Sequence, residues 1–259
     1  RLAELRGRDL FPQPDESHLG ECPLCCLPLP LDPRKSTLDT CCCKIICNGC
    51  SYENKKRERE AGLQHRCSFC REPAAKSDGE GLKRMMKRIK KHNDPVAMAQ
   101  MGGTRFKEGD HNKAFEYFTK AAALGNADAR YRLGCMYFYG NAVEKDEKKA
   151  IHHLEQAAIG GHPHARGALA MLEKINDRFE RAAKHLIIAA NLGSDASLKT
   201  IKGLYSAGLA SKDDYAAALR GYQAALDAEK STERENAEKA TKNGLSKSFN
   251  GKGFEHTFL

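Results

Sequence analysis

Tryptophan is absent from the 259-residue sequence, and aromatic residues make up only 7% of it. A large aromatic core or a platform for stacking nucleic-acid bases is therefore not expected. No apolar run approaches the ~18 residues that a membrane span requires, so we expect no membrane partner. The first residue is Arg1 rather than methionine. The sequence is thus expected to be a fragment or a processed form, and its lack of a signal peptide carries no information.

Cysteine is abundant but confined, because ten of the eleven cysteines lie between Cys22 and Cys70. A secreted disulfide scaffold is a short chain stapled throughout, whereas these thiols are local and paired as C-x-x-C. The pattern favours metal binding in a reducing intracellular compartment, cytoplasmic or nuclear. The formal charge of +9 falls once metal-bound thiolates are counted, so it is weak evidence for a nucleic-acid partner.

Composition and periodicity divide the chain into five stretches. These are a disordered lead (1–21), a cysteine-rich zinc finger (22–73), a basic amphipathic connector helix (74–93), four helical repeats (94–226), and a polar helix with a disordered tail (227–259).

The cysteine spacing predicts two zinc sites. A C-x-x-C pair presents two thiolates at the right bite for tetrahedral Zn²⁺, with Zn–S bonds near ~2.3 Å. Three such pairs and one triplet supply at least eight thiolates, enough for two closed structural sites. The alternative is a set of free or disulfide-bonded thiols. The cysteines in chain order are Cys22, Cys25, Cys41, Cys42, Cys43, Cys47, Cys50, Cys67 and Cys70, and the adjacent Cys26 is expected to be a small buried residue.

The motifs Cys22-Pro-Leu-Cys25, Ile46-Cys47 and Cys67-Ser-Phe-Cys70-Arg71 resemble an all-cysteine RING finger. The resemblance implies that the zinc ligands interleave along the chain. One ion would bind Cys22, Cys25, Cys47 and Cys50, and the second Cys41, Cys42, Cys67 and Cys70. The four-residue spacing of the all-cysteine form selects Cys42, but the choice of Cys41 with Cys43 stays open. About fifty residues with few large apolar side chains would depend on these ions for most of their folding free energy.

In RING fingers that act as ubiquitin ligases, two non-ligand positions contact the conjugating enzyme. The resemblance places Leu24 and Arg71 at these positions. Departures from the family pattern are Ser68, where proline is common, and a charged helix (55–60) beside the expected groove. Contact with a conjugating enzyme and an ordinary packing or solvated role are therefore equally favoured for both residues.

A recurring alanine pair marks the repeats, which are about 35 residues long. Each pair is preceded, seven residues earlier, by another alanine, and an apolar residue between them completes one helical face. The earlier alanines are Ala114, Ala150, Ala182 and Ala217. Residues 127–134, followed by Tyr137, Gly140 and Asp146, resemble the Sel-one-like repeat, a relative of the tetratricopeptide repeat. The other copies are degenerate, with Gly221 where a large apolar residue is expected. The resemblance implies stacked helix pairs that hold a protein partner.

The connector carries an apolar face and a basic face. Leu82, Met85, Met86 and Ile89 fall at helical spacing and are expected to dock on a neighbouring part of the chain. The opposite lysines and arginines could form a nucleic-acid patch, but a solvated face is favoured because aromatic residues are not interleaved with them. The crowded histidines at 152, 153, 162 and 164 are expected to lie on the surface rather than to bind metal.

The predicted fold is a small zinc-bound α+β RING-like domain followed by an all-α solenoid of helix-turn-helix repeats. No nucleophile–base pair, phosphate loop or paired acid site stands out. The first functional hypothesis is a zinc-binding RING-type protein whose repeats recruit a protein partner and which, as a ubiquitin ligase, positions a conjugating enzyme. The alternative is a non-catalytic RING-like scaffold, and a nucleic-acid-associated zinc protein is the least favoured.

Overall fold

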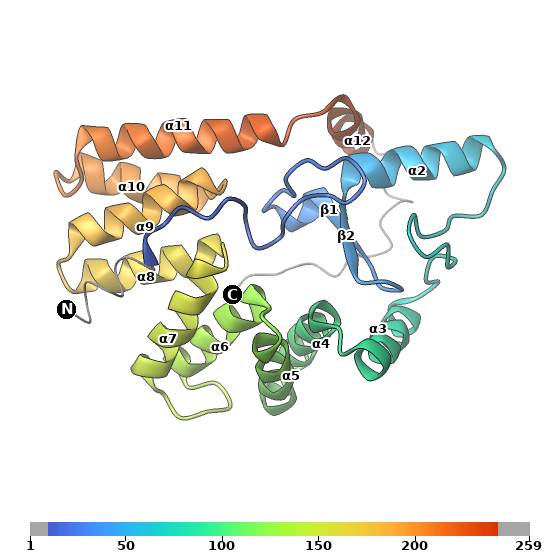
Figure 1. The fold of residues 1–259 in the computed structure, drawn as a ribbon, viewed down its shortest axis with the longest axis horizontal. Helices are drawn as coiled ribbons and strands as arrows, with labels where there is room; N and C mark the ends of the chain where they lie inside the picture. Colours follow the sequence, from blue (N-terminus) through green and yellow to red (C-terminus); the bar gives the residue numbers. More distant parts are fainter. Residues whose placement is uncertain (1–9, 243–259) are drawn as a thin grey trace.

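A computed structural model describes residues 10–242 of the chain. A cysteine-rich module with one small sheet precedes a curved array of paired helices (Figure 1). The array follows helix α3 (Asp78–His92). Its pairs are α4 (Pro95–Lys107) with α5 (His111–Ala123), α6 (Ala127–Tyr139) with α7 (Glu147–Ile159), α8 (Pro163–Ile175) with α9 (Phe179–Asn191), and α10 (Asp195–Ser206) with α11 (Lys212–Ala228), and the last described helix is α12 (Thr232–Lys242).

The cysteine-rich module (residues 22–73) is built around one hairpin and one helix. Strands β1 (Ser36–Asp39) and β2 (Lys44–Cys47) pair antiparallel, with Ser36 opposite Cys47. A short 3₁₀ helix, η1 (Pro33–Lys35), precedes them. The backbone enters α2 (Asn48–Glu60) directly from β2, and the thiol of Cys47 caps this helix by accepting a hydrogen bond from the amide of Cys50. The predicted α+β character of this region is present as a two-stranded sheet and a helix.

Alanine and glycine set the close packing of the helix pairs. Ala121, Ala157 and Ala189 are fully buried, so adjacent helices approach without large side chains between them. A Cβ atom at Gly134 would lie 2.9 Å from Cγ of Leu154, so the crossing of α6 and α7 requires glycine there. The all-α solenoid of helix pairs predicted from the alanine repeat is confirmed.

The fourth pair follows the repeat with a shift of one residue. Ala218 is fully buried, whereas the predicted Ala217 is only partly buried. Tyr222 packs on the core formed by α8 to α11 and supplies the large side chain that was expected at position 221. A Cβ atom at Gly221 would lie 1.7 Å from Oδ1 of Asn191, so glycine is needed for α11 to pass α9.

The predicted disordered lead differs from the structure over the part that is described. Leu10 is buried in a cluster with Leu154 and Leu169, and the amide of His18 donates a 3.0 Å hydrogen bond to the carbonyl of Gly161. The polar composition of the lead hid these contacts, because they come from a few side chains and from the backbone. Residues 10–18, the docked segment, therefore pack on the helical repeats. Residues 1–9 and the predicted tail beyond residue 242 lie outside the described part.

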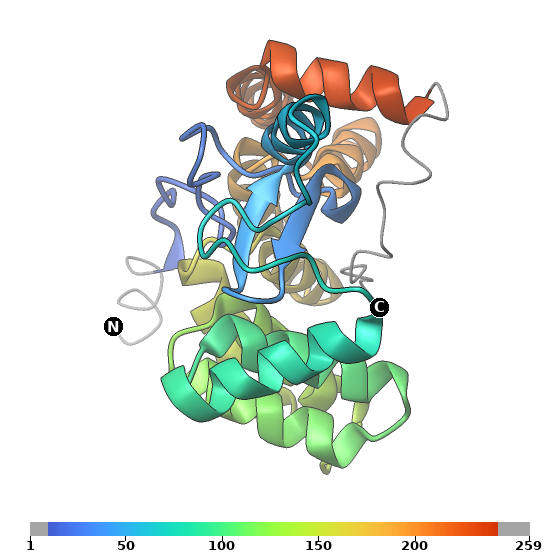
Figure 2. The ribbon, with the colours of Figure 1, turned by 90° about the vertical axis from the view of Figure 1, so that its right-hand side faces the viewer.

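The cysteine-rich module joins the two ends of the array, as Figures 1 and 2 show. At one end, buried Cys43 packs with Met85 of α3 and Met101 of α4. At the other end, α12 packs against α2. Lys35 and Glu238 add an ion pair of 2.8 Å there. The helices thus curve around the module instead of extending as an open rod.

No helix between residues 10 and 242 has both the length and the apolar composition that a membrane span requires.

Candidate metal centre

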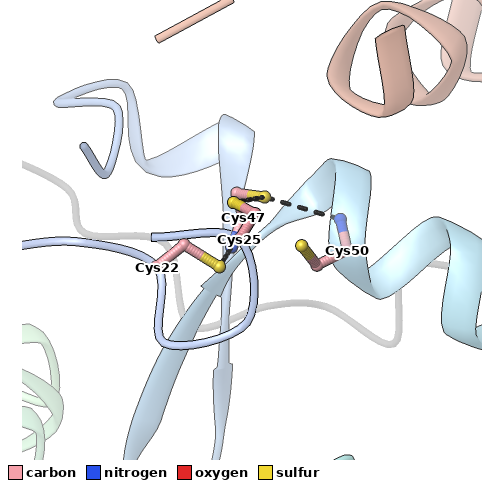
Figure 3. Close-up of side chains that lie close together, drawn as sticks. All are labelled: Cys22, Cys25, Cys47 and Cys50. Carbon is pink, nitrogen blue, oxygen red and sulfur yellow. Dashed lines mark hydrogen bonds between the residues drawn. The ribbon is translucent and has the colours of Figure 1, made fainter. Parts of the chain in front are cut away.

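The first cysteine cluster combines a loop at the start of the module with the β2–α2 junction. The thiol sulfurs of Cys22, Cys25, Cys47 and Cys50 all lie within 4.8 Å of one another. Figure 3 shows the four side chains pointing toward a common centre. Cys22 and Cys47 are buried, so this centre is shielded from water on the side of the module core. These are the four residues that the RING resemblance groups around one ion.

The second cluster joins the β1–β2 turn to the loop after α2. The sulfurs of Cys41, Cys42, Cys67 and Cys70 also lie within 4.8 Å of one another. The tight turn presents Cys41 and Cys42 together, while Cys67 and Cys70 come from one C-x-x-C loop. Each cluster therefore ties together segments about 20 to 30 residues apart, as the interleaved ligand order requires.

The sulfur separations agree with tetrahedral zinc. Bonds of ~2.3 Å at tetrahedral angles put neighbouring thiolates about 3.8 Å apart. The observed distance is 3.8 Å between Cys25 and Cys47 and 3.6 Å between Cys42 and Cys67, while Cys70 and Cys41 are closer at 3.2 Å. All eleven cysteines are free of disulfides. Both clusters therefore offer donor sets that fit a closed four-thiolate site.

Within each cluster the thiols share protons unevenly. The hydrogen bond with Cys47 lowers the pKa of Cys22 to about 4, while the same contact and burial raise the pKa of Cys47 above its usual range. The hydrogen bond with Cys41 likewise lowers the pKa of Cys42 to about 6. Burial raises the pKa of Cys67 to about 12. Without a cation, the thiols whose pKa is raised keep their protons at neutral pH while Cys22 and Cys42 lose theirs, and a divalent cation would displace the remaining protons.

Main-chain amides and one arginine surround the first cluster. The amide of Cys47 donates to the sulfur of Cys22, and the amide of Cys50 donates to that of Cys47, both at 3.4 Å (Figure 3). The guanidinium of Arg234, on α12, donates to the sulfur of Cys25 at 3.6 Å. Such outer hydrogen bonds orient ligands and offset the negative charge of a four-thiolate site.

The remaining cysteines lie outside both clusters. Cys43 is 6% exposed and packs with Met85 and Met101, and burial raises its pKa to about 12. The geometry therefore favours Cys42 over Cys43 as a ligand. Cys26 is exposed with a φ of 55°, in contrast to the buried position expected from the sequence, because it closes the turn after Cys25 in a left-handed conformation.

The two positions assigned to contact with a conjugating enzyme are both accessible. Leu24 is 42% exposed, and Arg71 is exposed with a φ of 60°. Helix α2 contains the charged residues 55–60 that lie beside the groove expected for a conjugating enzyme. Its first turn packs against α12, where a Cβ atom at Gly49 would lie 2.7 Å from the backbone nitrogen of Arg234. Leu24 and Arg71 are thus accessible, whereas the first turn of α2 contacts α12.

A third group of metal-ligating residues was missed by the sequence analysis. His18, Asp128 and His162 have ligand atoms within 4.8 Å of one another, and His162 is fully buried rather than on the surface. Nδ1 of His162 accepts the amide hydrogen of Ala165 at 3.2 Å and caps α8. A neutral imidazole then carries its proton on Nε2, which lies 3.5 Å from Oδ1 of Asp128. This arrangement fits a buried histidine–aspartate contact better than a metal ligand.

The basic connector uses part of its charge internally. Met85 is fully buried, which agrees with the predicted docking of the apolar face. Arg84 pairs with Glu80, and Arg88 pairs with Asp94, each at 2.6 Å. The lysines at 83, 87, 90 and 91 stay exposed on the other face.

Comparison with known families identifies the helix pairs. Residues 96–126, 127–162 and 167–194 match the Sel1 repeat model. These ranges span α4 to α9 apart from the first turn of α8, so the chain contains Sel1 repeats, as residues 127–146 suggested. The fourth predicted repeat, α10 with α11, lies outside the matched ranges.

Known proteins are similar to parts of this chain. The crystal structure of a Sel1 repeat protein from Oxalobacter formigenes is 25% identical, with a TM-score of 0.51, over 68% of this chain and 70% of that one. DAP3-binding cell death enhancer 1 of Mus musculus is 27% identical over 52% of this chain and 34% of its own length. An uncharacterised Sel1-like repeat-containing protein of Schizosaccharomyces pombe is 41% identical over 58 residues, 20% of this chain and 9% of its own length. The chain thus spans about a third or less of these two curated relatives.

Proposed function

Because three of its helix pairs match the Sel1 repeat, we propose that this chain is a zinc-stabilised scaffold that binds a protein partner on those repeats. The observation that carries this proposal is an apolar rim along successive repeats, formed by Tyr139, Ile175 and Leu209. These side chains are 67%, 68% and 41% exposed. Each lies at or just after the end of the first helix of its pair. Large apolar side chains repeated along one edge are typical of a protein-binding surface.

The location of the rim agrees with the arrangement of the module. The α8–α9 and α10–α11 turns face away from the cysteine-rich module (Figure 1). A partner on these turns would therefore not have to displace the cysteine-rich module.

The rim is tested by quantitative affinity purification of the full chain from cells, followed by direct binding of the purified partner. Tyr139→Ser with Ile175→Ser should lose a partner that the wild-type chain retains. Leu63→Ser is the matched control, because Leu63 is 64% exposed but lies in the cysteine-rich module. An identical partner set for all three proteins contradicts the rim proposal.

Two structural zinc ions are part of this proposal. The two four-cysteine clusters would hold them, and closed thiolate sites have no open position for catalysis. Zinc would supply folding free energy to a module whose buried apolar core is small. Reduced thiols would be maintained in the cytoplasm or the nucleus.

A second candidate function is that of a RING-type ubiquitin ligase. The exposure of Leu24 and Arg71 supports it, because both positions assigned to contact with a conjugating enzyme are accessible. The module would act by positioning a charged conjugating enzyme beside a substrate lysine. The contact of α12 with α2 opposes this function, because it covers the first turn of the helix that would lie beside a bound conjugating enzyme. Discharge of ubiquitin from a panel of conjugating enzymes tests this function. Failure with every enzyme would contradict it and leave the scaffold proposal.

A nucleic-acid partner is the least supported alternative. Arg84 and Arg88, two of the connector's basic side chains, are engaged in ion pairs within the chain. Steeply salt-dependent binding of RNA or DNA would be required to support it.

A further inference from the structure

The docked segment occupies a groove on α7, α8 and α9 with residues that point into the array. The side chain of Leu10 is 4% exposed and lies in a cluster with Leu154 of α7 and Ala165 and Leu169 of α8. Leu10 thereby completes a core that the helices leave open. The same segment approaches the α7–α8 turn so closely that a Cβ atom at Gly161 would lie 2.5 Å from the carbonyl oxygen of Glu16.

Arg166 binds the backbone of this segment. Its side chain is 1% exposed, and its guanidinium donates hydrogen bonds to the carbonyls of Leu10 and, at 3.5 Å, Pro12. Burial lowers the pKa of Arg166 to about 10, so the group stays charged at neutral pH. No carboxylate pairs with Arg166 among residues 10–242. A buried cation is costly unless it is hydrogen-bonded. The two carbonyls bind Nη1 and Nη2 without requiring particular side chains, while the buried Nε of Arg166 has no hydrogen-bond partner among residues 10–242.

The groove also selects an aromatic residue next to the aliphatic one. The ring of Phe11 lies 4.7 Å from that of His185, and the guanidinium of Arg181 lies over Phe11 at 5.0 Å. Burial, together with the nearby Arg166 and Arg181, lowers the pKa of His185 to about 3, so this ring is neutral. A neutral ring and a cation around one aromatic side chain form a pocket of stacking and cation–π contacts.

We propose that this groove is a peptide-binding site for a segment with the order aliphatic–aromatic–proline, provided by a partner protein and bent as residues 10–12 are here. In the described fold the chain's own residues 10–13 occupy this groove and block a partner from binding there. The chain bends at Phe11 and Pro12, so that the carbonyls on either side of the aromatic residue face Arg166. The amide of Asn191 adds a 3.0 Å hydrogen bond to the side chain of Gln13. This site is separate from the apolar rim, so the two proposals fail independently.

The docked segment competes with any partner segment for the same groove, and this competition determines when a partner can bind. A segment tethered by a short linker acts at an effective concentration in the mM range. A partner segment of equal intrinsic affinity therefore binds weakly until the docked segment is released. The chain's own residues act as a built-in competitor, and changes that weaken their docking open the site.

The experiment uses the full chain and a labelled synthetic peptide with the sequence of residues 8–18, measured by fluorescence anisotropy. The double variant Leu10→Ser with Phe11→Ser empties the groove. It should bind the peptide at least 10-fold more tightly than the wild-type chain does. A peptide with the same two serine substitutions should not bind, and this control does not alter the protein.

Two further variants test the arginine in the double-variant background. Arg166→Met should abolish peptide binding, whereas Arg130→Met, at the same helical position of the preceding repeat, should leave it unchanged. Unaltered helical circular dichroism verifies that both proteins are folded. The proposal is overturned by equal binding of the two peptides, by equal affinity of the wild-type chain and the double variant, or by retained binding in folded Arg166→Met. A wild-type chain that dimerises by exchanging residues 10–18 also overturns it, because the occupant is then a second copy.

Discussion

The guanidinium Nη2 of Arg234 lies 3.6 Å from the sulfur of Cys25, although 209 positions separate the two residues in the sequence. The same side chain donates to the carbonyl of Pro28 at 2.9 Å and to that of Leu27 at 3.3 Å. One residue of the last described helix thus contacts the sulfur and the backbone of the first cysteine loop. The cysteine clusters and the closure of the array are therefore physically linked.

Metal removal should separate the module from the array. The purified chain should hold two zinc ions, and chelation should unfold residues 22–73 and release α12, because both depend on the geometry of the first cluster. The helices α4 to α11 contain no residue of either four-cysteine cluster and should keep their circular dichroism. Metal analysis combined with far-ultraviolet spectra measures this. One ion or none per chain, or loss of the whole helical signal, contradicts the expectation.

Neighbouring cysteines should respond differently to the same substitution. Cys42→Ser should lose the second zinc under a chelator challenge, because it removes a thiolate from the cluster. Cys43→Ser should keep both ions and lower the free energy of unfolding by about 1–3 kcal/mol, since it buries a hydroxyl among Met85 and Met101. Metal content and urea denaturation of the two variants measure the difference. Loss of zinc from Cys43→Ser but not from Cys42→Ser would identify Cys43, rather than Cys42, as the ligand.

Gly49→Ala should detach α12 while both clusters remain intact. The added Cβ would lie 2.7 Å from the backbone nitrogen of Arg234, which cannot yield without moving the helix. We expect faster proteolysis around residues 230–242 with unchanged zinc content. The matched control is Gly103→Ala in α4, where the space is open and alanine should stabilise the helix by about 0.5–1 kcal/mol. Equal proteolysis of Gly49→Ala and the wild-type chain would show that this contact is not tight.

Overpacking one helix crossing should weaken the array. Ala157→Leu inserts three carbons at a fully buried position and should cost about 1–3 kcal/mol of unfolding free energy. Ala224→Leu in the last pair, one residue before the position that corresponds to Ala157 after the shift, is exposed and should change stability by less than about 0.5 kcal/mol. Thermal melting of the two variants measures this, and equal midpoints contradict it.

The ligase candidate makes a prediction that separates docking from discharge. Leu24→Ala should weaken binding of a conjugating enzyme, whereas Arg71→Ala should leave binding nearly intact and slow ubiquitin discharge, because its role would be to fix the enzyme–ubiquitin geometry. Neither residue belongs to a cysteine cluster, so both variants should keep two zinc ions. Unchanged discharge in both variants assigns Leu24 and Arg71 to ordinary surface roles.

The periodic features of the sequence predicted the periodic part of the fold. Alanine at a fixed interval identifies the helix crossings because a stacked repeat places the same residue at the same contact. The prediction failed by one residue in the last pair, where Ala218 replaces Ala217. The cause is the approach of α11 to Asn191, a contact between repeats that no local pattern encodes.

Contacts between distant segments could not be predicted in the same way. The grouping of the eight cysteines followed from a resemblance, and the geometry agrees with it because spacing within each pair limits where thiols can meet. The docking of Leu10 and the burial of Arg166 have no such signal, since a proline-containing polar lead and a single arginine look solvated. His162 was likewise expected at the surface, because its partners Asp128 and His18 come from two other segments.

The link between α12 and the first cysteine loop also has a kinetic consequence. Stacked repeats that touch only their neighbours fold from any point and fray at their ends. Here the first and last helices contact the same module, so the ends of the array are held. Contacts of such large sequence separation form slowly, because loop-closure entropy is lost before they stabilise the chain. We therefore expect the repeats to form early and the closure by α12 to be the last step of folding and the first to reverse.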